Sequence, residues 1–306
     1  MNQHKHKLSL AGFFITLFGA LFFSTKAIIV KSAFRDIHTD ALTLLTLRMV
    51  FSLPFYLMAA FFISKKKDNN PMTIKQWIGV SMVGLTGYYI SSLCDFIGLQ
   101  FITAGLERLI LFLYPTLVLL INAYFFGQKV NLLQKTALLL TYLGIGIAFY
   151  GELHIEGHNS DFYYGSFMVF LCAVTYSIYI TFSGRIVPLI GAGKFTAYAM
   201  LAATIGIFLH FSIAGNFNTL NTGKGLWWYG LLLALIATVI PSFMLSFGLK
   251  KIGSNNVAIV SAIGPVSTIL QGHFILGEPL FAEQIAGTFL VIAGVVLIGW
   301  KREQTL

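Results

Sequence analysis

The sequence predicts an all-α integral membrane protein with ten transmembrane helices in a 5+5 inverted repeat and with both termini in the cytoplasm. Three observations lead to this fold class: an apolar composition, a series of apolar windows of membrane-spanning length, and an internal similarity between the two halves. Of the 306 residues, 57% are hydrophobic and 10% are charged, and the mean hydropathy is +0.81. Soluble domains carry about 25% charged residues, so a soluble fold of this composition would lack polar atoms to cover its surface.

The ten spans follow from the length of a membrane-crossing helix, which is about 20 mainly apolar residues. The first window follows a basic start, as a signal peptide does, but its apolar run is too long for one and no clear cleavage site follows. We therefore expect it to remain as the first span. The predicted spans are 8–30, 40–64, 77–99, 103–126, 132–150, 163–183, 195–214, 226–249, 254–276 and 281–300.

The orientation of these spans follows from the Lys and Arg residues between them. With cytoplasmic termini, fourteen of the twenty Lys and Arg residues lie in inside segments, and the outside loops hold three: Lys31, Arg35 and Lys224. The net charge of +9 is therefore a topology signal. It does not indicate nucleic-acid binding, because no continuous basic face or nucleic-acid motif is present. Cys94 and Cys172 lie inside apolar segments, so we expect no disulfide framework, metal or cofactor.

The inverted repeat appears when the chain is shifted by 150 residues, because the halves then align without gaps from the third span onward. Trp77 meets Trp227, Pro115 meets Pro265, and "GLQFI" at 98–102 meets "GLKKI" at 248–252. The predicted repeats are residues 1–153 and 160–306, within one integral domain. Each holds five spans, an odd number, so the second must cross the membrane upside down. Inverted repeats of this kind are common in secondary transporters.

The same features resemble a known family. Ten spans in about 300 residues, with prolines midway along the fourth and ninth spans, are similar to the EamA branch of the drug/metabolite transporter superfamily. The stretches that carry the resemblance are "STKAIIVKSAF" (24–34), "TLLTLRMVFSLPFYL" (43–57), "AGLERLILFLYPT" (104–116) and "LGEPL" (276–280). The resemblance implies a carrier of the bacterial inner membrane, often an exporter of amino acids and related metabolites. The first repeat departs from the pattern, with "GQK" (127–129) where the second has "GEP" (277–279).

Five charged residues lie inside predicted spans and are the main candidates for a substrate-binding or coupling site: Lys26, Arg48, Asp95, Glu107 and Arg108. Charges near the bilayer centre cost roughly 2.5–3.5 kcal/mol, so they usually face a cavity or a partner. All five fall in the outer half of the predicted bundle. The repeat places uncharged residues at the matching positions: Tyr179, Tyr198 or Ala199, Leu245, Val257 and Ala258. This one-sidedness predicts a polar site or gate built mostly by the first repeat.

Structural roles are open for several of these charges. Asp95 and Lys26 could sit near the interface, with Lys26 snorkelling outward. Glu107 in a first helical turn would suit the helix dipole, whereas Arg108 there would not. Neighbouring residues point about 100° apart on a helix, so these two side chains are expected to serve different neighbours rather than each other.

Weaker candidates complete the predicted site. Gln271 and His273 point to different faces of the ninth span, and Tyr114 could line a cavity together with Tyr88, Tyr89, Tyr176 and Tyr179. Pro115 and Pro265 are predicted helix breaks that could free carbonyl groups toward a cavity or simply bend the helices during packing.

The function expected from these features is secondary active transport of a small polar metabolite, such as an amino acid or related zwitterion, with export as the expected direction. Arg48 or Arg108 would attract a carboxylate, and Glu107 or Asp95 would hold an ammonium group or a coupling proton. The other expected partners are the lipid bilayer and a second protomer of a homodimer. Glycine-rich spans such as 142–151 could pack either within the monomer or between protomers. Alternatives are a membrane-embedded enzyme, for which no HExxH or GxSxG motif is present, and a channel or lipid translocator, for which no filter segment is recognised.

Overall fold

The computed structural model describes residues 10–65, 71–127, 132–156, 160–221, 223–261 and 263–300, and within these ranges the chain is helical with no strand. The helices of the first half are α1 (Leu10–Ile37), α2 (Ala41–Ser64), α3 (Ile74–Gly84), the π-helix η1 (Leu85–Ile90), α4 (Ser91–Gly98), α5 (Ala104–Leu111), α6 (Tyr114–Phe126) and α7 (Leu132–Glu156). Those of the second half are α8 (Ser160–Ile190), α9 (Ala192–Ala214), the 3₁₀-helix η2 (Phe217–Asn221), α10 (Lys224–Ala234), the π-helix η3 (Leu235–Val239), α11 (Ile240–Ser261), α12 (Gly264–Gln271), the π-helix η4 (Gly272–Leu276) and α13 (Ala282–Trp300).

Seven helical segments of the described chain are long and apolar enough to cross a membrane: Leu10–Ile37, Ala41–Ser64, Ile74–Gly98, Ala104–Phe126, Ser160–Ile190, Ala192–Ala214 and Gly225–Leu245. Two shorter apolar segments, Leu139–Gly151 and Ala282–Gly294, lie within α7 and α13. Large apolar side chains such as Phe62, Ile213 and Phe274 are more than 60% exposed, as expected for residues that face lipid. The fold is that of a multi-pass membrane protein.

Several helix boundaries differ from the sequence prediction. α1 continues to Ile37, so Lys31 and Arg35, which were expected in an outside loop, lie in its last two turns. Long basic side chains can remain helical there because they reach past the apolar zone to water or to polar partners. α11 runs through 250–253, where a connection was expected, and the predicted ninth span is divided between α11 and α12.

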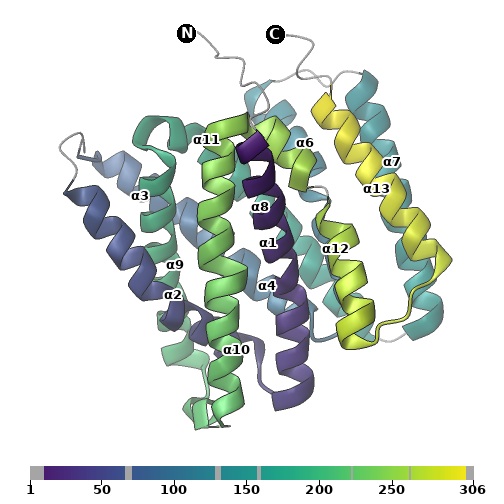
Figure 1. Ribbon diagram of the computed structural model, residues 1–306, viewed down its shortest axis with the longest axis horizontal. Helices are drawn as coiled ribbons and strands as arrows, with labels where there is room; N and C mark the ends of the chain where they lie inside the picture. The colour runs from purple at the N-terminus through teal and green to yellow at the C-terminus, as the bar shows by residue number, and fades with distance from the viewer. Residues whose placement is uncertain are drawn as a thin grey trace.

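Small residues bring the helices close together, as is usual where lipid removes the hydrophobic drive for association. α7 and α13 lie side by side at the right of Figure 1, and Gly144 of α7 meets Gly287 of α13 backbone to backbone. α1 and α11 run together through the centre, where Gly19 packs on Met244 and Leu245. The glycine pair between α7 and α13 places part of the glycine-rich span 142–151 inside the monomer, whereas Gly146 faces open space.

The two faces of the bundle can be told apart by the ends of the chain. The start of α1 and the end of α13 lie at the same face, at the top of Figure 1, which we call the terminal face. The connection from η4 to α13 (277–281) lies at the opposite end, which we call the distal face. Asp40 caps the start of α2, with its carboxylate accepting a hydrogen bond from the Thr43 backbone N–H at 2.8 Å, so the 38–40 connection turns tightly at the distal face.

Candidate functional site

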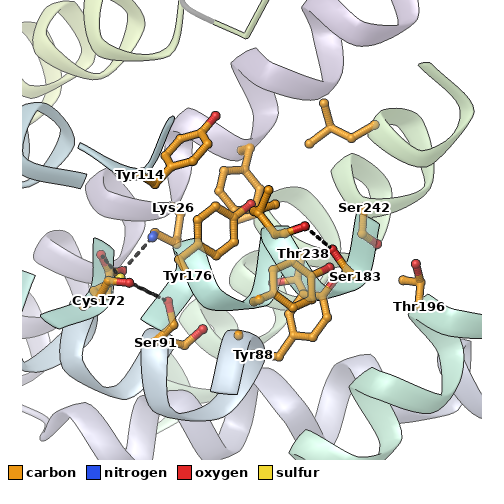
Figure 2. Close-up of a pocket in the computed structure, with 18 of the residues that line it drawn as sticks. Lys26, Tyr88, Ser91, Tyr114, Cys172, Tyr176, Ser183, Thr196, Thr238 and Ser242 are labelled. Carbon is orange, nitrogen blue, oxygen red and sulfur yellow. Dashed lines mark hydrogen bonds and ion pairs between the residues drawn. The ribbon is translucent and has the colours of Figure 1, made fainter. Parts of the chain in front are cut away.

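A cavity of about 300 Å³ lies inside the bundle, at the lower end of the volumes usual for small-molecule sites, which are about 300–1,000 Å³. Its lining comes from α1, α2, α4, α5, α6, α8, α9 and α11 and from the two π-helices η1 and η3, so both halves of the chain contribute. Figure 2 shows Lys26, Ser91 and Cys172 at one end, tyrosine rings in the middle, and the hydroxyl groups of Thr196 and Ser242 at the other. The cavity therefore has one charged end and an aromatic body.

The charged end is built around the ammonium group of Lys26 on α1. Its Nζ lies 2.6 Å from Oδ2 of Asp95 on α4 and 3.6 Å from Oε1 of Glu107 on α5. The exposed fractions of these three residues are 7%, 1% and 0%, so the ion pairs lie in a region with little screening by water. Such a triad is costly to break once formed, because any unpaired member would leave a buried charge. The interface role considered for Asp95 and Lys26 does not describe this arrangement.

Arg48 on α2 is the second cation that lines the cavity, and it has weak partners. Its Nη1 donates to the Ser92 hydroxyl at a long 3.4 Å, and its guanidinium lies 5.6 Å from the centre of the Phe96 ring. Nε has no hydrogen-bond partner, and no carboxylate among the described residues lies within 4 Å of the guanidinium. The residue is only 5% exposed. A buried guanidinium without a directly contacting carboxylate among the described residues thus lies at the wall of the cavity.

Glu107 and Arg108 point to different neighbours, as their spacing predicted. The Glu107 carboxylate turns to Lys26, and neither of its oxygens accepts a hydrogen bond from a described donor. Arg108 Nη2 donates to the Ser24 hydroxyl at 3.0 Å, and its guanidinium lies 5.6 Å from the Phe23 ring and against Gly264 at the start of α12. Neither residue lines the cavity, so both sit behind its wall.

The body of the cavity is a set of tyrosine rings from both halves. Tyr114 meets Tyr176 edge to face with ring centroids 5.2 Å apart, and Tyr176 stacks on Tyr179 at 5.5 Å. The hydroxyl groups of Tyr179 and Tyr88 share a hydrogen bond of 2.6 Å. Tyr114, a weaker candidate from the sequence, is thus part of the wall. Tyr89 is not; its ring lies near His210 instead.

The remaining predicted residues lie away from this cavity. Gln271 donates to Ser267 within its own helix at 2.8 Å, and His273 Nδ1 lies 2.9 Å from the Glu278 carbonyl. Pro115 and Pro265 occupy the first turns of α6 and α12, and the helix is interrupted just before each of them. Both prolines therefore mark breaks in the spans that contain them.

Sequence reasoning missed several lining residues, including Ser91, Ser92, Tyr56 and Cys172. The two serines could have been found, because they precede Asp95 by four and three residues and so share its helix face. Cys172, which the sequence places inside an apolar segment, is buried, and it also lines the charged end, with Sγ 3.2 Å from the Ser91 hydroxyl. Nothing local in its apolar surroundings distinguishes it from a packing residue.

Polar contacts join the two halves of the chain at the distal face. Glu278 lies in the connection before α13, and its carboxylate accepts a hydrogen bond of 2.9 Å from the backbone N–H of Ala104, the first residue of α5. Lys31 Nζ lies 3.8 Å from the same carboxylate and donates to the Ile102 carbonyl at 2.6 Å. A carboxylate at a helix N-terminus is favoured by the exposed N–H groups there. We call Lys31, Ala104 and Glu278 the distal latch.

The cavity extends toward the other face. Its lining includes Val187 and Ala192, beside the junction of α8 and α9. Gly193 in this junction lies against Ile63 near the end of α2. Because α1 and α2 are joined by a tight connection at the distal face, the end of α2 lies at the terminal face. The cavity therefore runs from the Lys26 cluster toward the terminal face, and the distal latch lies at the opposite end.

Comparisons with known proteins agree with this architecture. The EamA-like transporter family matches residues 10–150 and 163–300. The uncharacterized transporter YcbK of Bacillus subtilis is 29% identical over 96% of this chain and 95% of its own length. An uncharacterized transporter of Archaeoglobus fulgidus is 25% identical over 73% of this chain and 78% of its own length.

A solved crystal structure has the same fold, with a TM-score of 0.66 at 16% identity, over 94% of this chain and 95% of the other. Two family matches that together cover nearly all of the described residues, on a helical bundle with an internal cavity, lead to one assignment. The chain belongs to the EamA-like transporter family.

Proposed function

We propose that this chain is a secondary active transporter that moves a small polar metabolite across the bacterial inner membrane by alternating access, with export as the working direction. The observation that carries the proposal is the cavity, which is lined by both halves, holds buried charges, extends to one face and lies opposite a polar latch. A central site between two halves, with one mouth shut, is what alternating access requires.

The positions of the helices support a two-repeat design. α3 and α10 begin at Ile74 and Lys224, α6 and α12 at Tyr114 and Gly264, and the π-helices η1 and η3 at Leu85 and Leu235, each pair 150 residues apart. The same offset aligns the two halves in sequence. Helix breaks and π-helices at matching positions in both halves support a 5+5 inverted repeat. In this proposal the terminal face is cytoplasmic.

In this proposal Arg48 binds a carboxylate of the substrate. Of the two arginines considered from the sequence, it alone lines the cavity and lacks a close anionic partner. Arginine suits this role because its planar guanidinium can form paired hydrogen bonds with a carboxylate. Arg108 is assigned to packing between α1, α5 and α12, since its contacts are Ser24, Phe23 and Gly264.

Glu107 is the proposed carrier of a coupling proton. It is fully buried, its only described ionic contact is the longer of the two to Lys26, and Asp95 competes for the same ammonium. The ionisable groups around it are Lys26 from α1, Asp95 from α4, Cys172 from α8 and Arg108 from its own helix. The described residues of α12 and α13 that contact α5, such as Ile269 and Gln284, carry no charge.

The proposal is tested with purified protein in liposomes and a broad panel of amino acids and organic acids, under imposed pH or ion gradients. We expect at least one compound to accumulate in response to a pH gradient. The Glu107→Gln variant should lose that response and keep exchange of substrate for substrate. The absence of movement for every compound, in protein shown to be folded, would exclude the proposed function. Stoichiometric metal in the pure protein would instead favour an enzyme, and conductance in planar bilayers would favour a channel.

A further inference from the structure

The charges that line the cavity bear on the chemical class of the substrate, given the proposed function. Three lining residues are charged: Lys26, Arg48 and Asp95. The 2.6 Å contact between Lys26 and Asp95 is short and charge-assisted, so this pair presents no net charge to a ligand. Arg48 is left over: it is more than nine-tenths buried, no carboxylate of the described residues lies within 4 Å of it, and Asp95 acts on it only from a longer distance.

The two charged residues behind the wall do not alter this balance. With Glu107 ionised, the cluster holds three cations, Lys26, Arg48 and Arg108, against two carboxylates. With Glu107 protonated, it holds three against one. The excess is therefore at least one positive charge in either protonation state, and Arg48 is the cation without a directly contacting carboxylate that lines the cavity.

We infer that the substrate is a small organic anion with one carboxylate and an apolar body, rather than a zwitterion. A zwitterion would bring an ammonium group, and the one carboxylate among the described lining residues, that of Asp95, is already paired with Lys26. Burying an ammonium without a partner costs considerably more than leaving it in water. An anion brings the single charge that Arg48 lacks.

The rest of the wall fits an apolar body with few polar groups. Tyr114, Tyr176 and Tyr179 present ring faces and edges, and the hydroxyls of Tyr88 and Tyr179 are bonded to each other. Figure 2 shows the Tyr176 ring between Lys26 and the residues Thr238, Ser183 and Ser242, which carry hydroxyl groups. Aromatic walls of this kind bind planar or aliphatic bodies by area and dispersion rather than by charge.

The test uses two sets of compounds that share a body and differ in charge. The first is 3-phenylpropanoate, phenylalanine and 2-phenylethylamine; the second is pentanoate, norvaline and butylamine. Binding to purified full-length protein at neutral pH is measured by the rise in unfolding temperature with ligand concentration. In each set that binds, we expect the anion to bind on the order of 10- to 100-fold more tightly than the zwitterion, and we expect the amine not to bind.

Variants separate the role of Arg48 from general effects. Arg48→Gln should remove the preference for the anion, and Arg48→Lys should retain part of it, which keeps the test valid if the glutamine variant folds poorly. Arg185→Gln is the matched control, because Arg185 is exposed and lies over the Phe126 ring away from the cavity. Its selectivity should equal that of the unmodified protein.

Three results would overturn the inference: equal or tighter binding of the zwitterion, an anion preference that survives Arg48→Gln, or no binding by any of the six compounds. Counterflow in liposomes is measured in parallel. Anion-selective binding without counterflow would support the inferred charge of the substrate and exclude the proposed transport function. Counterflow of phenylalanine in preference to 3-phenylpropanoate would support transport and exclude the inferred charge.

Discussion

Lys26 is predicted to contribute more to stability than either carboxylate that it contacts. With an effective dielectric constant of about 20, its attraction to Asp95 at 2.6 Å is about 6 kcal/mol and that to Glu107 at 3.6 Å is about 5 kcal/mol. In Asp95→Asn, Lys26 keeps Glu107 as a counter-ion, and both the repulsion between the two carboxylates and the cost of burying one of them disappear. These changes offset most of the lost attraction, so the loss should be about 2 kcal/mol or less. In Lys26→Met, two buried carboxyl groups lose their shared ammonium, and breaking a buried pair in this way costs about 3–5 kcal/mol.

The assay is thermal unfolding of the purified variants in one detergent, at one pH and ionic strength. Lys26→Met should lower the unfolding midpoint by on the order of 10 °C, and Asp95→Asn by clearly less. The double variant should be more stable than Lys26→Met alone, because it removes one of the two stranded carboxyl groups. Equal effects of the two single variants, or a double variant as unstable as the sum of both, would show that Glu107 does not share the ammonium.

Two further variants test the latch and the wall. Glu278→Gln should open the distal face more often and raise the leak of substrate through the protein by several-fold. The control is Glu283→Gln, because Glu283 is an exposed residue in the first turn of α13 and its replacement should not change the leak. Equal leak in both variants would exclude the role of the distal latch. Gly87→Ala should reduce transport about tenfold or more, because a methyl group there would overlap the Tyr179 ring, whereas Gly146→Ala meets open space and should behave as the unmodified protein in the same liposome assay.

Hydropathy was sufficient to predict most of the helical segments, because each needs only a long apolar run to exist. It could not place their ends where polar side chains continue a helix: Lys31 and Arg35 were assigned to a loop because they are charged, yet they extend α1 by two turns. The breaks before Pro115 and Pro265 were predictable from the missing amide hydrogen and ring of proline. The π-helices η1, η3 and η4 have no comparable local signature in the sequence.

The burial of the five charged candidates was predictable from the sequence, whereas their pairings and most of the cavity lining were not. Five buried charges in apolar spans had to face partners or a cavity, and all five are at least nine-tenths buried at one cluster or beside it. Which charge meets which depends on helix rotation and on contacts between residues far apart in the chain, such as Lys26 with Asp95. One sequence does not encode these distances in any local pattern, and the same is true of Cys172 at the cavity wall.

The distal latch and the charge cluster share the same two helices. Ala104, which Glu278 holds, begins the short helix that carries Glu107 three residues later, and Lys31 lies on α1 five residues after Lys26. A ligand or proton that changes the ion pairs of Lys26 therefore acts on α1 and α5, the helices that carry Lys31 and Ala104 of the distal latch. By thermodynamic linkage the effect runs both ways: the factor by which a ligand favours the sealed state equals the factor by which the sealed state binds that ligand more tightly.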